Sequence, residues 1–165
     1  MIQRRAALVA AFFLTATWTG LASTPKNLST DGPRIEGVKT TAYSASVEDN
    51  GDNDGRNALG RPLKTGRVTS AAADWSRWPV GTRFRIVETG QEYVVDDYGS
   101  ALVGTGTIDL YKTSDSQVDR WGVRHVTIEV LEWGSPQKSL QILRERRGAR
   151  HIREMVKALQ SQEVA

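Results

Sequence analysis

The chain has 165 residues, a formal net charge of +3 and no cysteine. The lack of cysteine excludes disulfides, thiolate metal sites and a lipid-modified cysteine. The charge is uneven, because residues 24–134 hold 13 Lys and Arg against 16 Asp and Glu, whereas residues 135–165 hold 7 against 3. A slightly acidic body with a basic tail argues against a nucleic-acid-binding core, so no nucleic-acid partner is expected.

Residues 1–23 have the layout of a secretory signal peptide: Arg4 and Arg5, a short apolar run over 6–14, and small residues before a cleavage point. An uncleaved membrane anchor is the alternative, but the run is short for a membrane span. The sequence therefore predicts a soluble product in the periplasm or cell envelope, with outer-membrane association left open. Residues 24–37 are polar, contain two prolines and predict a flexible lead-in.

Residues 38–134 predict one compact, mainly β domain. Short runs rich in β-branched and aromatic residues alternate with turn signals, which favours a β-barrel of six or more strands. The expected strands are 38–44, a turn and strand over 63–73, a hairpin of 83–87 and 92–95, then 108–111 and 126–130. A short helix is expected from Ser114 to Trp121, ended by Gly122.

Residues 135–165 predict a basic helical tail. Pro136 suits the first position of a helix, and Gly148 divides the tail into two helical pieces. Apolar residues recur at helical spacing in the second piece, namely Ile152, Met155, Val156 and Leu159. Such a face usually packs against its own domain, and a weak hold on an anionic wall or membrane is the alternative.

The loop over 47–57 is polar and acidic. Asn50, Asp52 and Asp54 superficially resemble the start of a calcium loop, but the twelfth position is Arg61 instead of Glu. A solvated loop is the favoured interpretation, and no metal is expected.

Three aspartates, Asp74, Asp97 and Asp109, lie at or near the ends of expected strands. If these ends converge, like charges in one cleft raise at least one carboxyl pKa and create a general acid. Such an acid suits protonation of a glycosidic oxygen. Nucleophilic catalysis has little support, since only His125 and His151 are available as bases, and no cofactor motif is present.

An ordered set of short motifs resembles the three-aspartate (3D) domain. The motifs are Thr41-Ala42-Tyr43, Ala73-Asp74, Pro79-Val80-Gly81-Thr82, Asp97-Tyr98-Gly99-Ser100-Ala101 and Ile108-Asp109-Leu110-Tyr111. The resemblance extends over 38–131 and includes the C-terminal domain of membrane-bound lytic transglycosylase A. Gly99 is followed by Ser100, where the domain usually has a second glycine.

The resemblance implies a six-stranded double-psi β-barrel of the rare-lipoprotein-A-like superfamily. It also implies cleavage of the β-1,4 bond between N-acetylmuramic acid and N-acetylglucosamine in peptidoglycan strands. Asp109 matches the acid/base, while Asp97 and Asp74 match the supporting catalytic carboxylates. The predicted substrate-binding residues are Tyr43, Thr65, Trp75, Tyr98 and Gly99.

Two other functions stay open. The first is a non-catalytic barrel module that loosens or grips wall glycan without cutting it, with Trp75, Trp78 and Tyr98 stacking on sugar rings. For Trp78, packing in the core is the favoured interpretation. A weaker alternative is an aspartic-protease-like pair of Asp97 and Asp109, for which a second Asp-Thr-Gly-like motif is missing.

Overall fold

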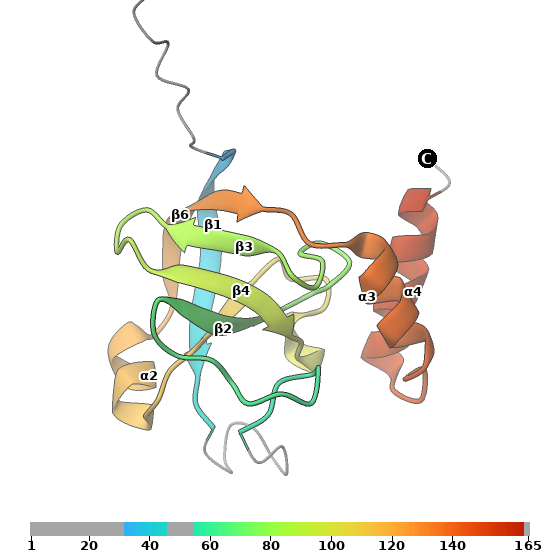
Figure 1. Ribbon diagram of the computed structural model, residues 1–165, viewed down its shortest axis with the longest axis horizontal. Helices are drawn as coiled ribbons and strands as arrows, with labels where there is room; N and C mark the ends of the chain where they lie inside the picture. Colours follow the sequence, from blue (N-terminus) through green and yellow to red (C-terminus); the bar gives the residue numbers. More distant parts are fainter. Residues whose placement is uncertain (1–31, 46–54, 164–165) are drawn as a thin grey trace, which may run out of the picture.

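The computed structural model describes residues 32–45 and 55–163 (Figure 1). The predicted signal peptide, most of the lead-in and most of the acidic loop with its calcium-like pattern lie outside these residues. The strands are β1 (Arg34–Tyr43), β2 (Val68–Ala73), β3 (Arg83–Ile86), β4 (Glu92–Asp97), β5 (Ile108–Tyr111) and β6 (Arg124–Glu132). The helices are the 3-10 turn η1 (Ser100–Leu102), α2 (Asp115–Trp121), α3 (Pro136–Arg144) and α4 (Arg150–Glu163).

The six strands close into a barrel in the order β1-β5-β2-β4-β3-β6. Two neighbouring pairs, β1 with β5 and β2 with β4, run parallel, and the other pairs run antiparallel. The predicted six-stranded double-psi β-barrel is confirmed, with a short helix and a C-terminal helical extension. Closure leaves no unpaired sheet edge in the barrel.

Strand alternation places one set of side chains inside the barrel and another outside. On β5, Ile108 and Leu110 are fully buried, whereas Asp109 and Tyr111 are half-buried on the opposite face. This is the arrangement that the period of two in a strand predicts. The outward face of β5 therefore presents a carboxylate and an aromatic ring beside the neighbouring strands β1 and β2.

Strand β1 begins earlier than the sequence predicts. Pairing with β6 already starts at Arg34 and Ile35, so residues 34–37 are part of the sheet and not of a flexible lead-in. The register shifts between Ile35 and Val38, where Gly37 has a φ of +68°. A glycine permits this bulge without the steric cost that a side chain would meet, and the bulge hides the strand from a simple alternation pattern.

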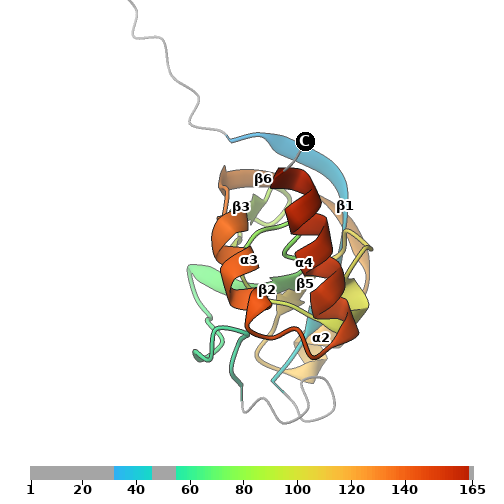
Figure 2. The same cartoon turned by 90° about the vertical axis from the view of Figure 1, so that its right-hand side faces the viewer.

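The C-terminal helices lie side by side and cover one side of the barrel (Figure 2). Leu140 and Leu143 of α3 and Met155 and Leu159 of α4 are buried in the same core cluster as Trp78 of the barrel domain. The prediction that the tail packs against its own domain is confirmed. The helical boundary at Gly148 is also confirmed, since α3 and α4 lie on either side of it.

A close backbone contact fixes the start of this tail. Gly134 lies against the turn over residues 79–82, and a Cβ placed there would come within 2.3 Å of the carbonyl oxygen of Pro79. The Ser139 hydroxyl accepts a hydrogen bond of 2.9 Å from the Val80 amide. Only glycine allows so close an approach of two backbones, so the turn and α3 are held together.

Candidate active site

Two of the three predicted aspartates line one hollow on the outer face of the barrel. Ala72 of β2 pairs with Asp97 of β4 on one side and with Asp109 of β5 on the other. All three residues line a hollow of about 230 Å³, closed at its other side by η1 and the residues before it. The small Ala72 side chain leaves room between the two carboxylates. The topology therefore brings together residues 12 positions apart in the sequence.

Asp109 is the more accessible of the two carboxylates. Its side chain is half-buried, and Oδ1 accepts a hydrogen bond of 2.6 Å from the Thr41 hydroxyl. Thr41 and Asp109 are direct partners in the parallel pairing of β1 and β5. The hydroxyl therefore fixes the orientation of a carboxylate that still borders the hollow.

Asp97 is nearly inaccessible, with 7% of its surface exposed. Its Oδ1 accepts hydrogen bonds from the amides of Ala58 and Tyr98, each 2.9 Å long, and its Oδ2 accepts one of 3.2 Å from the Tyr43 hydroxyl. Burial raises the pKa of Asp97 to about 6, although these three donors act in the opposite direction. The site therefore contains a carboxyl that titrates in the mildly acidic range.

Tyr43 links the Asp97 carboxylate to the aromatic ring of Tyr111. Burial, followed by the nearby charge of Asp97, raises the pKa of Tyr43, so its phenol stays protonated and donates. Its ring packs against Tyr111 with 5.6 Å between the ring centroids. Tyr43 thus lines the hollow, and its hydroxyl donates to Asp97; its role in substrate binding stays a prediction.

The third aspartate, Asp74, does not join Asp97 and Asp109 in one cleft, as the sequence predicted, but bonds to a neighbouring loop. Its Oδ1 accepts hydrogen bonds from the amide and the hydroxyl of Ser76, at 2.9 and 2.6 Å, and its Oδ2 accepts one of 2.8 Å from the Gly104 amide. It is 4% exposed and does not line the hollow of Asp97 and Asp109. Its carboxylate ties the end of β2 to the loop between η1 and β5, which positions one wall of the site.

The predicted substrate-binding residues separate into three groups. Tyr98 and Gly99 line the aspartate hollow, whereas Thr65 lines a different pocket. Trp75 is fully buried and its indole N–H donates to the carbonyl oxygen of Asp97 at 2.8 Å, so stacking of Trp75 on a sugar ring is wrong for this structure. The reason is that Trp75, two residues after β2, belongs to the core cluster and is bonded to the last residue of β4. Trp78 is also buried, in agreement with its expected packing role.

A further carboxylate, which no sequence pattern predicts at the site, is buried next to Asp97. Asp96 is 2% exposed, its Oδ2 accepts from the Ser70 hydroxyl at 3.1 Å, and Lys64 Nζ lies 3.4 Å away. Its Oδ1 has no hydrogen-bond partner among the residues that the structure describes. The charge of Asp96 contributes to the raised pKa of Asp97. The only sequence signal for Asp96 was the pair Asp96-Asp97 at the end of a strand. Successive side chains of a strand point to opposite faces, so only one of these two aspartates faces the hollow.

Within residues 32–45 and 55–163 there is no cluster of three metal-ligating side chains. In the same ranges, no helix has the length and apolar character needed to cross a bilayer.

Comparison with known proteins bears on this site. The model of the 3D domain family matches residues 69–132, which contain Asp74, Asp97 and Asp109, β2 except its first residue, and all of β3 to β6. No curated protein matches the chain. The matched segment, the closed double-psi barrel around it and the two aspartates at one hollow agree with one another, and residues 69–132 fit a 3D domain.

Proposed function

We propose that the protein cleaves the β-1,4 bond between N-acetylmuramic acid and N-acetylglucosamine in peptidoglycan, in the manner of a lytic transglycosylase. The 3D family is associated with lytic-transglycosylase-like domains that act on peptidoglycan. The observation that carries the proposal is the hollow in which Asp97 and Asp109 of this family's domain flank Ala72.

In the proposed reaction Asp109 is first the acid and then the base. Its protonated carboxyl donates a proton to the glycosidic oxygen as the bond to the muramyl C1 breaks, so the leaving sugar departs with a hydroxyl. The Asp109 carboxylate then takes the proton of the muramyl C6 hydroxyl, whose oxygen attacks C1. The product is a 1,6-anhydro end, and the carboxyl is protonated again.

Accessibility and orientation support this division of roles. Asp109 borders the hollow with a half-buried side chain and is oriented by Thr41. Asp97 is more buried, and both of its oxygens accept hydrogen bonds from the protein. Asp97 is therefore proposed as the positioning and electrostatic partner. Asp74 is proposed to act through the loop that it holds.

The proposal includes the place of action, because its substrate lies outside the cytoplasm. The signal-like residues 1–23 support export to the periplasm or cell envelope. The basic residues of α3 and α4 support a weak association of the tail with an anionic surface, as a secondary partner beside the glycan strands.

A glycan-binding module without catalysis is the second candidate function. It is favoured by the size of the hollow, since about 230 Å³ is smaller than the ~300–1,000 Å³ of typical small-molecule sites. The burial of Trp75 and Trp78, however, removes two of the three expected aromatic platforms and leaves Tyr98, which lines the hollow.

Mass spectrometry of purified sacculi separates the candidates. The mature protein and its Asp109→Asn variant are incubated with sacculi in parallel, and Asp119→Asn on the exposed face of α2 serves as the matched control. Anhydro-ended fragments from the unaltered protein and the control alone are the expected result. Reducing ends would mean hydrolysis by water, and sacculus binding without fragments would favour the binding module.

A further inference from the structure

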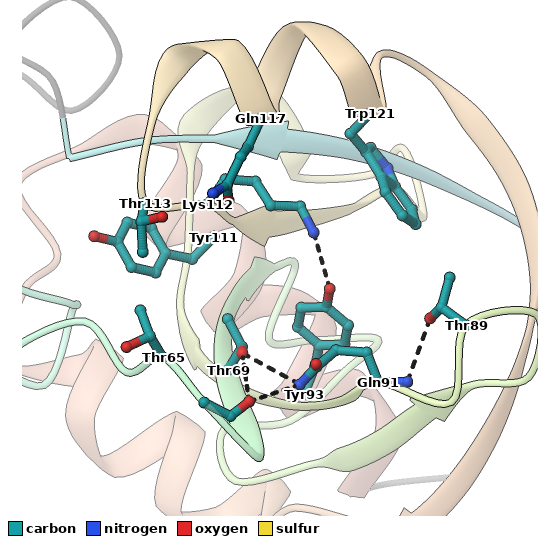
Figure 3. A pocket seen from close by; sticks show the side chains of 11 residues that line it. Thr65, Thr69, Thr89, Gln91, Tyr93, Tyr111, Lys112, Thr113, Gln117 and Trp121 are labelled. Atoms are coloured by element: carbon teal, nitrogen blue, oxygen red, sulfur yellow. Dashed lines mark hydrogen bonds between the residues drawn. The ribbon is translucent and has the colours of Figure 1, made fainter.

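A second and larger pocket lies beside the aspartate hollow. Its volume is about 460 Å³, and its walls come from the segment before β2, the β3–β4 hairpin, the end of β5 and helix α2 (Figure 3). Its lining residues include Thr65, Gln91, Tyr93, Tyr111, Lys112 and Trp121. Tyr111 lines this pocket and packs against Tyr43, which lines the aspartate hollow. The two pockets therefore adjoin through the contact between Tyr43 and Tyr111.

Lys112 places a positive charge inside this pocket. Figure 3 shows its side chain reaching across the pocket, where Nζ donates a hydrogen bond of 3.0 Å to the Tyr93 hydroxyl. The ammonium also lies 4.6 Å from the centroid of the Trp121 ring. One of its three N–H donors is thereby used, and the ring contact holds the amine in place.

This charge is not compensated within the described part of the chain. No Asp or Glu there forms an ion pair with Lys112. Glu92, the residue before Tyr93, is already engaged by Arg83 and Arg85. Partial burial, together with the nearby charge of Arg124, lowers the pKa of Lys112.

A second cation strengthens the positive character of this wall. The Arg124 guanidinium lies 4.4 Å from the centroid of the Trp121 ring, and Arg120 and Arg124 line a smaller hollow that shares Lys112 and Trp121 with the pocket. A partly desolvated cation beside further cations is stabilised by an anion that completes the site.

The rest of the lining suits a flexible polar chain. Thr65, Thr89 and Thr113 provide hydroxyls, while Tyr93, Tyr111 and Trp121 provide aromatic surface. Gln91 is held in place, since its side-chain amide donates to the carbonyl oxygens of Gly66 and Glu92 at 2.9 Å. Hydroxyls, aromatic edges and one half-buried ammonium together match a short peptide that carries a carboxylate.

We propose that this pocket binds the peptide stem of the wall glycan, with Lys112 pairing with a stem carboxylate while the sugar lies at Asp97 and Asp109. The inference rests on the proposed function, because the stem is attached to the muramyl sugar that would occupy the aspartate hollow. The pocket is then a specificity site that distinguishes stem-bearing strands from uncharged chitin-like strands, which have no carboxylate.

Binding of a free stem peptide tests the pocket separately from catalysis. The probes are the tripeptide L-Ala-γ-D-Glu-L-Lys and its counterpart in which every carboxylate is a carboxamide. Affinities are measured by NMR titration for the unaltered protein, Lys112→Gln, Lys112→Arg and the control Lys138→Gln, which removes an exposed lysine of α3. Thermal unfolding of each variant verifies that it is folded.

The expected result is binding of the acidic tripeptide that weakens about tenfold or more in Lys112→Gln, the size of one charge-assisted hydrogen bond. Lys112→Arg should recover part of the affinity, Lys138→Gln should retain all of it, and the amidated peptide should bind poorly. Equal binding of both peptides, equal binding by Lys112→Gln, or no binding to the folded protein would overturn the inference.

Cleavage of sacculi is measured on the same samples. Fragment release without tripeptide binding would leave the proposed function standing and overturn the stem pocket. Lysine-dependent tripeptide binding without any fragment release would support the pocket and contradict the cleavage reaction.

Discussion

The Tyr43 hydroxyl donates a hydrogen bond of 3.2 Å to Oδ2 of Asp97, and each of the two side chains is only 7% exposed. Burial disfavours the charged form of both groups and raises both pKa values, that of Asp97 to about 6. The phenol therefore remains a donor at the pH values at which the carboxyl gains or loses its proton. The pair makes the charge of the site respond to mildly acidic conditions.

The ionisation of Asp97 makes stability depend on pH. Its pKa is about 6 in the folded protein, against an ordinary value of 3.8, so the folded state binds more protons than the unfolded chain between these values. The free energy of unfolding therefore falls as the pH rises through this window. The decrease is complete once the pH lies above the folded-state pKa of Asp97. We expect a decrease of at most about 3 kcal/mol relative to Asp97→Asn.

Urea denaturation at a series of pH values between about 4 and 7 measures this difference. The variant lacks the titrating group, so its stability should decrease less over the same range. Parallel pH profiles for the two proteins would show that Asp97 keeps an ordinary pKa.

Removing the Tyr43 hydroxyl should raise the pKa of Asp97 further. The hydrogen bond from Tyr43 is one of the interactions that favour the ionised carboxyl, and Tyr43→Phe eliminates it without removing the ring. The expected pKa lies above about 6, measured by ¹³C NMR of the Asp97 carboxyl during a pH titration. Tyr111→Phe is the matched control, since its ring packs on Tyr43 but no hydrogen bond joins it to Asp97. A shift of equal size in both variants would argue against the assigned role of the Tyr43 hydroxyl.

The fold was largely predictable because strand and turn signals are local. The alternation of Ile108, Asp109 and Leu110 placed one carboxylate on an outward face, and the structure confirms it. Pro136 and Gly148 likewise marked helix boundaries through their own backbone preferences. Ser114 is at the expected cap position, but its hydroxyl makes no capping hydrogen bond and lies 3.1 Å from that of Ser116.

The partners of the site residues were less predictable, because they depend on strand order and on side-chain direction after a strand ends. Asp74 directly follows β2 and Asp97 ends β4, yet Asp74 bonds to Ser76 and Gly104 while Asp97 borders the hollow. Lys112 gave no sequence signal, since an isolated lysine after a strand is usually solvated. Its position became evident only when β5, β4 and α2 were placed around one pocket.

Asp74 should contribute more to folding stability than to the chemical step itself. Asp74→Ala removes the acceptor of three hydrogen bonds, from the Ser76 amide, the Ser76 hydroxyl and the Gly104 amide. We expect a loss of about 2–4 kcal/mol in the free energy of unfolding, because two backbone donors lose a charged partner. Faster hydrogen exchange of the Gly104 amide should accompany this loss of stability.

Asp119→Ala, on the exposed side of α2, is the control for Asp74→Ala. Unchanged exchange at Gly104 would refute the assigned link between β2 and the loop.

The C-terminal helices should be integral to the stability of the barrel domain. Leu143 of α3 is fully buried in the cluster that contains Trp75 and Trp78, so Leu143→Ala leaves a cavity in the main core. The expected cost is about 2–5 kcal/mol of unfolding free energy, whereas Gln141→Ala, an exposed position of the same helix, should change it by less than about 0.5 kcal/mol.

Denaturation is followed separately by tryptophan fluorescence and by far-ultraviolet circular dichroism. The comparison shows whether the C-terminal helices unfold together with the barrel or before it. Since Trp75 and Trp78 belong to the barrel domain while α3 and α4 contribute strongly to the helical signal, coincident transitions would mean that helices and barrel unfold together. Loss of the helical signal before the fluorescence change would mean that the tail detaches first. In that case Leu143→Ala should shift only the helical transition, and the tail would be free to exchange its barrel contacts for an anionic surface.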